Sequence, residues 1–569
     1  MTGVNRTLRV LPAVPLLLLA AACGPDEPSR ADSPPSFASP APLAPPAGDP
    51  AALAARAVAA MSDQDLAGEV LMPYAYGNSA TAVDGPSKAG NQKLAGVDTP
   101  AQMVARYHLG GLILVSFSAA DPTSTTNPTT NVDGPEQVRA LTDGLQAAAR
   151  ALPGGAPMMI GTDQEYGVVT RVTNGVTLLP SAMAAGAAGR PELTKAAWHA
   201  AGEELAAMGV TVDFAPDADT LGPPANTVIG SRSFGGDAKA NATQVAAAVA
   251  GLRSAGVTAG LKHFPGHGHT SGDSHETLPV VAQSHDAWTR QDLPPFQAGI
   301  TAGAGVVMSG HLDVPSLDKG VPATFSHKVM TDVLRGQLKF TGVAVTDAMN
   351  MPPAMKWPPG EAAVRALNAG NDMLLMPPDI GAARDGIVAA LKDGSLPRPR
   401  LVEAVTRVLT LNFRAAEQPR PGLSTVNTPA HQQAVSALDA ASITVLRGRC
   451  DGPLVDGPVT VSTQAVRATA RDNLTGALRD EGIPTGSGGT VIRLVGYGDK
   501  PSDLDPRADV TVMMDTPYLL SSARSGTLLA SYSSSKLSLK ALAAVLAGKA
   551  KATGRSPVAV AALPRTACG

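Results

Sequence analysis

Residues 257–270 read Val-Thr-Ala-Gly-Leu-Lys-His-Phe-Pro-Gly-His-Gly-His-Thr, and Asp273-Ser274-His275 follows shortly after. An apolar strand over Val257 to Leu261 runs here into a loop rich in glycine, proline and histidine. Four of the ten histidines of the chain fall within this segment. In a parallel α/β fold, a loop that follows a strand lies at the carboxyl end of the sheet, where active sites are found. The stretch therefore predicts a buried strand with a polar site at its end.

Short apolar strands alternate with helical runs on both sides of this stretch. Strands are expected at residues 110–115, 158–161, 210–215, 306–308, 342–347 and 373–376. Helices are expected at residues 137–149, 196–208, 240–255, 295–302, 328–338, 362–369 and 401–414. Repeated strand–helix alternation is typical of a parallel α/β fold, because each helix crosses the sheet between two parallel strands. The pattern predicts a TIM-type (β/α) barrel over residues 51–415.

The rest of the chain predicts a second domain. Residues 416–430 contain Pro419, Pro421 and Pro429 and are expected to form a linker. Further strands are expected at residues 459–461, 491–495, 510–514 and 527–532, with helices at residues 466–481 and 536–549. A smaller α/β sandwich domain is therefore expected over residues 431–569.

The first residues are typical of an export signal. Two arginines precede an apolar run from Leu11 to Ala22, which is shorter than the ~20 residues that a membrane helix needs. Residues 1–22 are thus expected to be a signal peptide. The run ends in Leu-Ala-Ala-Ala-Cys, which resembles a bacterial lipobox and predicts lipidation of Cys23; a plain signal peptide with a coincidental cysteine is the alternative. Residues 23–50, rich in proline, alanine and serine, are expected to be an extended tether. We expect an exported protein, lipid-anchored at the extracytoplasmic face of the cell membrane.

Composition and cysteine content add two constraints. The 45 Lys and Arg residues nearly balance the 48 Asp and Glu residues, which argues against a basic groove for nucleic acid. Only 3% of the residues are aromatic, so the core must be built mainly from Ala, Val, Leu and Ile. In the oxidising environment that an exported protein meets, Cys450 and Cys568 are expected to form a disulfide, with two free buried thiols as the alternative.

Candidate catalytic residues lie at strand ends and in the histidine loop. Asp273 and His275 are two residues apart, which lets the carboxylate hold the imidazole and stabilise its charged form, so that the imidazole can transfer a proton. Asp347 ends a predicted strand, the usual place for a nucleophile or charge stabiliser in a barrel. Asp163 and Arg171 have the chemistry to accept substrate hydroxyls and to brace a substrate. Arg232 is a further candidate.

Each candidate has a structural alternative. Asp347 could cap the N-terminus of a helix. Arg171 and Arg232 could form surface ion pairs. The histidines of the loop could bind zinc, although their spacing matches no compact ligand pattern. The four possible ligands are His263, His267, His269 and His275.

Together, these segments resemble glycoside hydrolase family 3, in its β-N-acetylhexosaminidase (NagZ-like) branch. The most specific match is the histidine loop, Lys262 to Gly268 followed by Asp273 to His275 and Leu278-Pro279. The nucleophile strand of the family matches Val345 to Met351, and its Asp-Gln-Glu segment matches Asp163 to Arg171. Further matches are Asp213 to Pro216, Ala530 to Ser533 and Gly548-Lys549, so the resemblance extends over about residues 51–560.

The resemblance implies a retaining mechanism. It implies Asp347 as the nucleophile and His275 as the general acid/base, with Asp273 as the partner of His275. This branch uses a His–Asp dyad where most retaining glycosidases use a second carboxylate. The residues that it implies for holding the sugar are Asp163, Arg171, Arg232, Lys262 and His263.

The implied activity is removal of a non-reducing GlcNAc from peptidoglycan-derived fragments. The expected partners are GlcNAc-containing saccharides or muropeptides, and the membrane through the lipid anchor. We expect no nucleic acid, no cofactor, no metal and a monomer. Two residues depart from the family pattern: Tyr166 stands where a glycine is usual and could narrow the floor of the pocket, and His269 stands where an aspartate is often found.

Three rival functions remain open. The first is a β-glucosidase or broad exo-glycosidase. The second is phosphorolysis, because a neutral imidazole repels an incoming phosphate less than a carboxylate does. The third is a non-catalytic wall-binding lipoprotein, against which the presence of both Asp347 and the Asp273–His275 pair argues.

Overall fold

The computed structural model describes residues 48–118, 121–222, 226–270 and 272–568. The predicted signal peptide, the predicted lipidation site Cys23 and nearly all of the predicted tether lie outside these ranges. Within them, no helix combines the length and the apolar character needed to cross a membrane.

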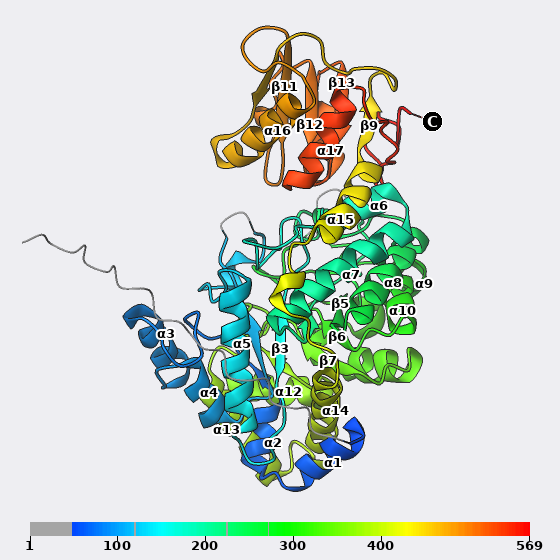
Figure 1. The fold of residues 1–569 in the computed structure, drawn as a ribbon. Helices are drawn as coiled ribbons and strands as arrows, with labels where there is room; N and C mark the ends of the chain where they lie inside the picture. Colours follow the sequence, from blue (N-terminus) through cyan, green and yellow to red (C-terminus); the bar gives the residue numbers. More distant parts are fainter. Residues whose placement is uncertain (1–47, 119–120, 223–225, 271, 569) are drawn as a thin grey trace, which may run out of the picture. The chain divides into compact units, whose positions relative to one another are not determined.

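The larger sheet is curled and consists of six parallel strands in the order β2-β3-β4-β5-β6-β7 (Figure 1). Strands β1 and β8 form a separate two-stranded parallel sheet. The predicted parallel α/β fold is thereby confirmed. The strands are β1 (Leu71–Met72), β2 (Gly111–Leu114), β3 (Met159–Thr162), β4 (Val212–Asp213), β5 (Thr258–Phe264), β6 (Val306–Ser309), β7 (Val343–Thr346) and β8 (Leu374–Leu375).

Helices alternate with these strands along the chain. Several are fixed at their first turn by a side chain: Ser62 caps α2 in a reciprocal pair with Asp65, and Thr99 caps α4 in the same way with Gln102. The α-helices are α1 (Pro50–Ala59), α2 (Asp63–Glu69), α3 (Gly85–Ala95), α4 (Pro100–Tyr107), α5 (Pro135–Arg150), α6 (Ala182–Ala188), α7 (Pro191–Met208), α8 (Ala238–Ser254), α9 (His285–Gln291), α10 (Leu293–Thr301), α11 (Pro315–Asp318), α12 (Pro359–Ala369), α13 (Ile380–Asp393) and α14 (Arg398–Ala416). Shorter turns are η1 (Ser124–Thr126), η2 (Gly230–Arg232) and η3 (Ala323–Phe325), and η4 (Lys328–Gln337) is a π-helix.

The sheet is apolar on both faces, as expected for parallel strands covered by helices. One cluster of buried side chains is contributed by the six-stranded sheet and by the β1–β8 pair, among them Met72 of β1, Ile113 of β2, Phe214 just after β4 and Val345 of β7. A second, larger cluster, rich in Ala, Val and Leu, fills the space between the strands and the helices. The low aromatic content of the sequence thus corresponds to an aliphatic core.

A second sheet follows, in the order β10-β11-β12-β13-β9. Strands β10 to β13 are parallel, and β9 pairs with β13 in the antiparallel direction. The elements of this part are η5 (Leu423–Thr425), α15 (Pro429–Ser442), β9 (Thr444–Arg447), β10 (Val459–Ser462), η6 (Ala465–Arg467), α16 (Ala468–Asp480), β11 (Thr490–Val495), η7 (Pro501–Asp503), β12 (Val510–Met513), η8 (Pro517–Ser522), β13 (Thr527–Ala530) and α17 (Lys536–Leu546).

Side chains near the first sheet contact the second part of the chain directly. The Ser181 hydroxyl donates a hydrogen bond to the Tyr532 carbonyl oxygen at 2.7 Å. Ile229, which directly precedes η2, is buried in one apolar cluster with Val495 at the end of β11. The turn that carries Arg232 is therefore packed against the second sheet.

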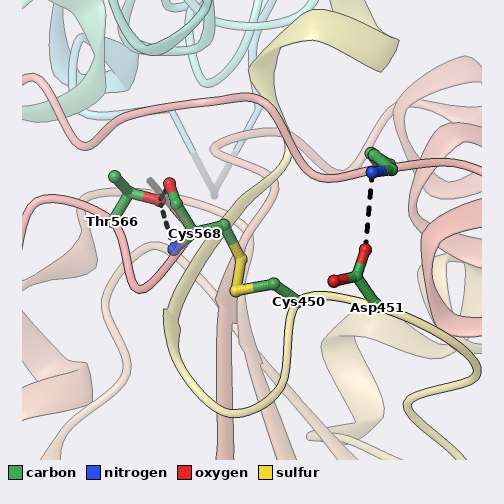
Figure 2. The surroundings of a disulfide bond; sticks show 5 residues. Cys450, Asp451, Thr566 and Cys568 are labelled. Atoms are coloured by element: carbon green, nitrogen blue, oxygen red, sulfur yellow. Dashed lines mark hydrogen bonds and ion pairs between the residues drawn. A yellow bond between two sulfur atoms is a disulfide. The ribbon is translucent and has the colours of Figure 1, made fainter.

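Cys450 and Cys568 form a disulfide, with their Cα atoms 5.4 Å apart (Figure 2). The structure therefore contains the expected disulfide and not the alternative of two free buried thiols. The bond joins the segment after β9 to the last described residues, and 118 positions separate the two cysteines. The loop that it closes contains β10 to β13 and the helices between and after them.

Several elements differ from the sequence-based expectation. The strands β1 and β9 were not predicted; β1 has only two residues and shows no detectable periodicity. The predicted helix at residues 328–338 has the wider hydrogen-bonding pattern of a π-helix, as in the bond from the Leu338 N–H to the Val333 carbonyl oxygen. Helix α15 begins at Pro429, inside the predicted linker, because Thr428 caps it.

Candidate active site

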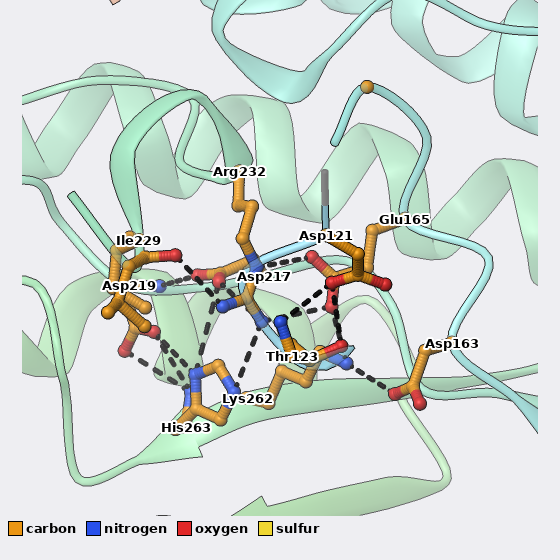
Figure 3. A network of polar contacts seen from close by, with 12 residues as sticks. Asp121, Thr123, Asp163, Glu165, Asp217, Asp219, Ile229, Arg232, Lys262 and His263 are labelled. Atoms are coloured by element: carbon orange, nitrogen blue, oxygen red, sulfur yellow. Dashed lines mark hydrogen bonds and ion pairs between the residues drawn. The ribbon is translucent and has the colours of Figure 1, made fainter. Parts of the chain in front are cut away.

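The candidate residues are collected at the carboxyl end of the first sheet. Lys262 and His263 are the last polar residues of β5, Asp163 follows β3, and Asp347 follows β7. Parallel strands end at the same edge of a sheet, so side chains far apart in the sequence meet there. This edge carries the network of polar contacts drawn in Figure 3.

Two carboxylates share one lysine. The Lys262 Nζ atom lies 2.6 Å from Asp163 Oδ1 and 2.6 Å from Glu165 Oε1 (Figure 3). Glu165 also accepts two hydrogen bonds from Arg232, from Nε at 2.7 Å and from Nη2 at 3.0 Å. This bidentate geometry fixes the plane of the guanidinium group.

Arg171 is held on the other side of Asp163. Its Nη1 atom forms an ion pair with Asp121, and its Nη2 atom donates to Thr123 Oγ1 at 2.9 Å and to Asp163 Oδ2 at 3.4 Å. The Arg171 and Arg232 side chains are almost completely buried. The alternative of surface ion pairs is therefore wrong for both arginines.

The charges of this network balance, since three cationic side chains face three carboxylates. Burial acts to raise the pKa of Glu165, but Arg232 and Lys262 outweigh it and hold the pKa well below its ordinary value. Burial likewise acts to lower the pKa of Lys262, but Asp163 and Glu165 raise it above its ordinary value. Glu165 and Lys262 are thus ionised at neutral pH, and the network forms a fixed polar surface with the chemistry to bind hydroxyl groups.

Asp347 lies in the loop after β7. Its backbone N–H donates to the Ser309 carbonyl oxygen at 2.9 Å, and its Oδ1 atom accepts the Ala348 N–H at 2.8 Å. Burial acts to raise the pKa of Asp347, but the imidazoles of His263, His311 and His275 outweigh it and lower the pKa. The next helix, α12, begins only at Pro359, so the alternative of a helix cap does not hold.

Asp273 and His275 are paired through two contacts. Asp273 Oδ1 accepts the backbone N–H of His275 and faces its Nδ1 atom, both at 2.8 Å. A carboxylate only accepts, so Nδ1 carries the proton and Nε2 is the atom that is free to exchange one. The His275 imidazole is also close enough to Asp347 to help lower its pKa.

The histidines of the loop have separate partners. His263 Nδ1 contacts Asp219 at 2.8 Å, His267 Nε2 contacts Ser274 Oγ at 3.0 Å, and His269 Nδ1 contacts Asp292 at 2.8 Å. The geometry does not support the proposed four-histidine zinc site. Within the described part of the chain, the residues close enough to share one ion are Asp217, Asp219 and His263.

Tyr166 points away from the polar site. Its backbone has φ 67°, a left-handed conformation that favours glycine. Its ring is buried against Trp198 of α7, edge to face, with the centroids 5.9 Å apart. The expectation that this ring could narrow the pocket is not supported, because the ring belongs to the core.

Sequence reasoning missed four residues of the site. Glu165, Asp121 and Asp219 bind the arginines and His263 as described above. His311, after β6, donates from Nε2 to the Ala348 carbonyl oxygen at 3.0 Å and contacts Thr324 Oγ1 through Nδ1 at 2.9 Å. Glu165 and His311 share one available signal, a polar residue within three positions of the end of a buried apolar strand. Asp121 and Asp219 lie six or more positions beyond their strands and give no such signal.

Comparisons with known proteins identify the family of the chain. Residues 88–411 match the model of the glycosyl hydrolase family 3 N-terminal domain. This match covers more than half of the chain. Fold, site and family model together define a glycoside hydrolase, and the chain belongs to glycosyl hydrolase family 3.

Two named relatives are hexosaminidases. The chain is 33% identical over 390 residues to beta-hexosaminidase A of Pseudoalteromonas piscicida, an alignment that covers 63% of this chain and 63% of that protein. The chain therefore spans less than two thirds of the length of this relative. It is 32% identical over 330 residues to beta-hexosaminidase LpqI of Mycobacterium tuberculosis, covering 56% of this chain and 78% of that protein.

A solved structure extends the likeness to both parts of the chain. It is that of a glycoside hydrolase family 3 beta-N-acetylglucosaminidase from Paenibacillus sp. str. FPU-7. The TM-score is 0.76 at 29% sequence identity, and the superposition covers 88% of this chain and 99% of that one.

Proposed function

We propose that this protein is a retaining exo-β-N-acetylglucosaminidase that removes non-reducing GlcNAc from peptidoglycan-derived fragments. The observation that carries the proposal is the proximity of an ionised strand-end carboxylate, Asp347, to an imidazole whose other nitrogen is held by a carboxylate, His275 with Asp273. A nucleophile and a proton shuttle are the two groups that a retaining glycosidase needs. The names of the hexosaminidase relatives support the sugar specificity.

In the first step, Asp347 attacks the anomeric carbon while the bond to the leaving oxygen breaks. His275 in its charged form gives the Nε2 proton to that oxygen and becomes neutral, and a covalent glycosyl–aspartate forms. In the second step, a water molecule attacks the same carbon, and His275 takes up its proton. The Asp347 carboxylate is released, and the sugar leaves with retained configuration.

The buried ion network supplies the sugar-holding groups. Asp163 is the most exposed of its three carboxylates, and it is oriented by Lys262 and Arg171. We assign Asp163, Arg171, Arg232, Lys262 and His263 to holding the terminal sugar before the scissile bond. Because these groups are fixed by one another, little conformational freedom is lost when a substrate binds.

We further propose that the first sheet is a complete (β/α) barrel over about residues 51–415. Two hydrogen bonds support closure: the Ile113 N–H to the Pro73 carbonyl oxygen, at 3.0 Å, links the segments of β1 and β2, and the Thr346 N–H to the Met373 carbonyl oxygen, at 3.0 Å, links those of β7 and β8. Residues 431–569 would then form the smaller α/β sandwich domain, joined through residues 416–430.

The proposed location follows from the N-terminal sequence. Residues 1–22 would be a signal peptide, Cys23 would carry the lipid, and residues 23–50 would be the tether. The disulfide between Cys450 and Cys568 is consistent with a protein that matures outside the cytoplasm. Labelling of cells with a radioactive fatty acid should mark the wild type and not a Cys23→Ala variant; a labelled variant would exclude this anchor.

The activity is tested on two aryl substrates that differ only in the sugar. The wild type should release the aryl alcohol from aryl β-GlcNAc and much more slowly from aryl β-glucose. Added phosphate should not accelerate release, and no sugar phosphate should form. Faster cleavage of the glucoside would favour the β-glucosidase alternative, and phosphate-dependent turnover would favour phosphorolysis. No turnover of either substrate would exclude the proposed function.

A further inference from the structure

Asp219 is a buried carboxylate behind the sugar-holding groups, and it binds the histidine loop at three points. It accepts the backbone N–H of His263 at 3.2 Å and that of His267 at 2.6 Å. Its Oδ2 atom lies 2.8 Å from His263 Nδ1 (Figure 3). One side chain thus fixes the path of the backbone from His263 to His267 and also orients the His263 ring.

The two ring nitrogens of His263 have partners of opposite kind. On the Nδ1 side, Asp219 only accepts hydrogen bonds, whereas on the Nε2 side the Arg232 Nη2 atom, at 3.3 Å, only donates them. Both contacts are satisfied by one neutral tautomer alone, with the proton on Nδ1 and the lone pair on Nε2. Burial and the charge of Arg232 lower the pKa of His263 to about 4, so the ring is neutral at pH 7.

We propose that Asp219 is a positioning residue that fixes this tautomer of His263 and, through the Nε2 lone pair, the place of Arg232 at the sugar-holding side of the site. The effect on catalysis rests on the proposed function. Without the Asp219 carboxylate, the other tautomer becomes populated as well; it directs an N–H at Arg232, so that two donors face each other. The guanidinium group, which also binds Glu165, is displaced, and the bound sugar loses its orientation.

Asp217 provides a matched control, because it is buried in the same place with a different role. Its Oδ1 atom accepts the Asp219 N–H at 2.9 Å. Its contact with His263 Nδ1 is long, at 3.9 Å. Burial and the neighbouring charge of Asp219 raise the pKa of Asp217 well above its ordinary value, which favours the neutral acid over the carboxylate. Asparagine has nearly the same shape as the neutral acid and keeps the oxygen that accepts the Asp219 N–H, so Asp217→Asn should have little effect.

The same three residues, Asp217, Asp219 and His263, are also close enough to bind a metal ion. Two observations favour a proton on His263 Nδ1 over a metal ion bound by these three residues. Asp219 already accepts three N–H groups, and the Arg232 guanidinium lies 3.7 Å from Asp217 Oδ2, where its positive charge opposes a cation. A chelator therefore provides a separate arm of the test.

The experiment compares wild type, Asp219→Asn and Asp217→Asn, each labelled with ¹⁵N in its ten histidines. The His263 signals are assigned from their loss in a His263→Gln variant. In the wild type at pH 7, Nδ1 should give the shift of a protonated ring nitrogen and Nε2 that of a bare one. Asp219→Asn should move both shifts towards the average of the two tautomers, because only Arg232 still favours the lone pair on Nε2, whereas Asp217→Asn should leave them in place. The opposite tautomer in the wild type would overturn the proposal without the need for any variant.

The kinetic arm uses aryl β-GlcNAc. Asp219→Asn should lower kcat/KM by about tenfold or more, mainly through KM, because a buried hydrogen-bonded pair is lost. In the His263→Gln background the same change should have little further effect, since the two residues act as one unit. Equal losses in Asp219→Asn and Asp217→Asn, or loss of wild-type activity in a chelator, would contradict the proposal. If the wild type cleaves no GlcNAc substrate, the proposed function fails while the tautomer measurement still decides the role of Asp219.

Discussion

Asp273 holds His275 twice through a single carboxylate oxygen, which accepts the backbone N–H and faces the ring Nδ1, both at 2.8 Å. The ring therefore has no freedom to rotate without breaking the contact that stabilises its charged form. Burial acts to raise the pKa of Asp273, but the hydrogen bond with His275 outweighs it and lowers the pKa. Asp273 is thus held in its ionised form beside His275.

The first prediction concerns this pair. His275→Ala should slow substrates with poor leaving groups far more than activated aryl glycosides, because an activated leaving group needs little protonation. Asp273→Ala should show the same pattern, and the double variant should lose little more than either single one. Rates on a series of aryl β-GlcNAc substrates of graded leaving-group pKa test this. Parallel losses across the series, or inhibition of the wild type by a chelator, would exclude His275 as the proton shuttle.

The second prediction concerns the nucleophile. Asp347→Asn should lower kcat by a factor of ~10³ or more, because the covalent intermediate can no longer form. Asp332→Asn, at an aspartate whose side chain is 64% exposed, serves as the control and should keep wild-type activity. Circular dichroism checks that both variants fold. Near-normal turnover by Asp347→Asn would remove Asp347 from the mechanism.

The third prediction concerns the cysteines. Mass spectrometry of a non-reduced digest should find one peptide that joins Cys450 to Cys568. A Cys450→Ser/Cys568→Ser variant should be less stable by about 2–4 kcal/mol, because the unfolded chain is no longer constrained by the cross-link. Denaturant unfolding of both proteins measures this difference. Two alkylated free thiols in the native protein would contradict the assignment.

The fourth prediction concerns stability against pH. Asp439 of α15 is fully buried, which raises its pKa from 3.8 to about 7, although the Ser538 hydroxyl donates to it and acts in the opposite direction. Between these two values, the folded protein keeps a proton that the unfolded chain has released. The contribution of Asp439 to stability is therefore complete below pH ~4 and is lost as the pH rises towards 7, at up to ~1.4 kcal/mol per pH unit.

This contribution is isolated by comparing wild type with Asp439→Asn. Free energies of unfolding are measured from pH 4 to pH 8 in both proteins. The difference between them should shift steadily in favour of the variant as the pH rises, because asparagine cannot ionise. The absolute offset at pH 4 reports the changed hydrogen bonding and is not part of the prediction. A difference that is independent of pH would show that Asp439 titrates normally.

The fifth prediction concerns Tyr166. Replacement by glycine relieves the left-handed backbone, worth roughly 1–2 kcal/mol, but removes a buried aromatic side chain, worth about 3–5 kcal/mol. Tyr166→Gly should therefore be less stable by about 1–4 kcal/mol, and Tyr166→Phe should lie close to wild type. Both should keep the KM for aryl β-GlcNAc, since the ring packs on Trp198. A changed KM in the folded variants would place the ring at the pocket after all.

Local sequence patterns predicted the strands that precede Asp163 and Asp347 and the strand that leads to Lys262, because each combines a buried apolar run with polar residues at its carboxyl end. They did not predict Glu165, whose role depends on Arg232, 67 positions further on. They also missed β9, which joins the second sheet through an antiparallel pairing with β13. Such features arise from contacts between distant segments, and the spacing of neighbouring residues does not report them.

The pairing of Asp219 with His263 is another contact between distant segments that local sequence patterns do not predict. The sequence identified His263 as a sugar-holding candidate, but the nitrogen that carries its proton depends on a carboxylate that is 44 positions away. The alternatives for Arg171 and Arg232 were likewise separated only by burial, since an ion pair at the surface and one in the interior have the same residue types. Burial changes the energetic consequence of losing one partner, which is small at the surface and large inside.

The disulfide between Cys450 and Cys568 also affects how the protein responds to proteolysis. The covalent ring encloses β10 to β13, so a single backbone cut anywhere between the two cysteines leaves both fragments attached to each other. The severed ends remain at high effective concentration, and the sheet can re-form after transient opening. A single nick outside the ring separates the chain into two pieces that share no covalent bond. A protease that reaches this protein therefore inactivates it more effectively through the first sheet than through the second.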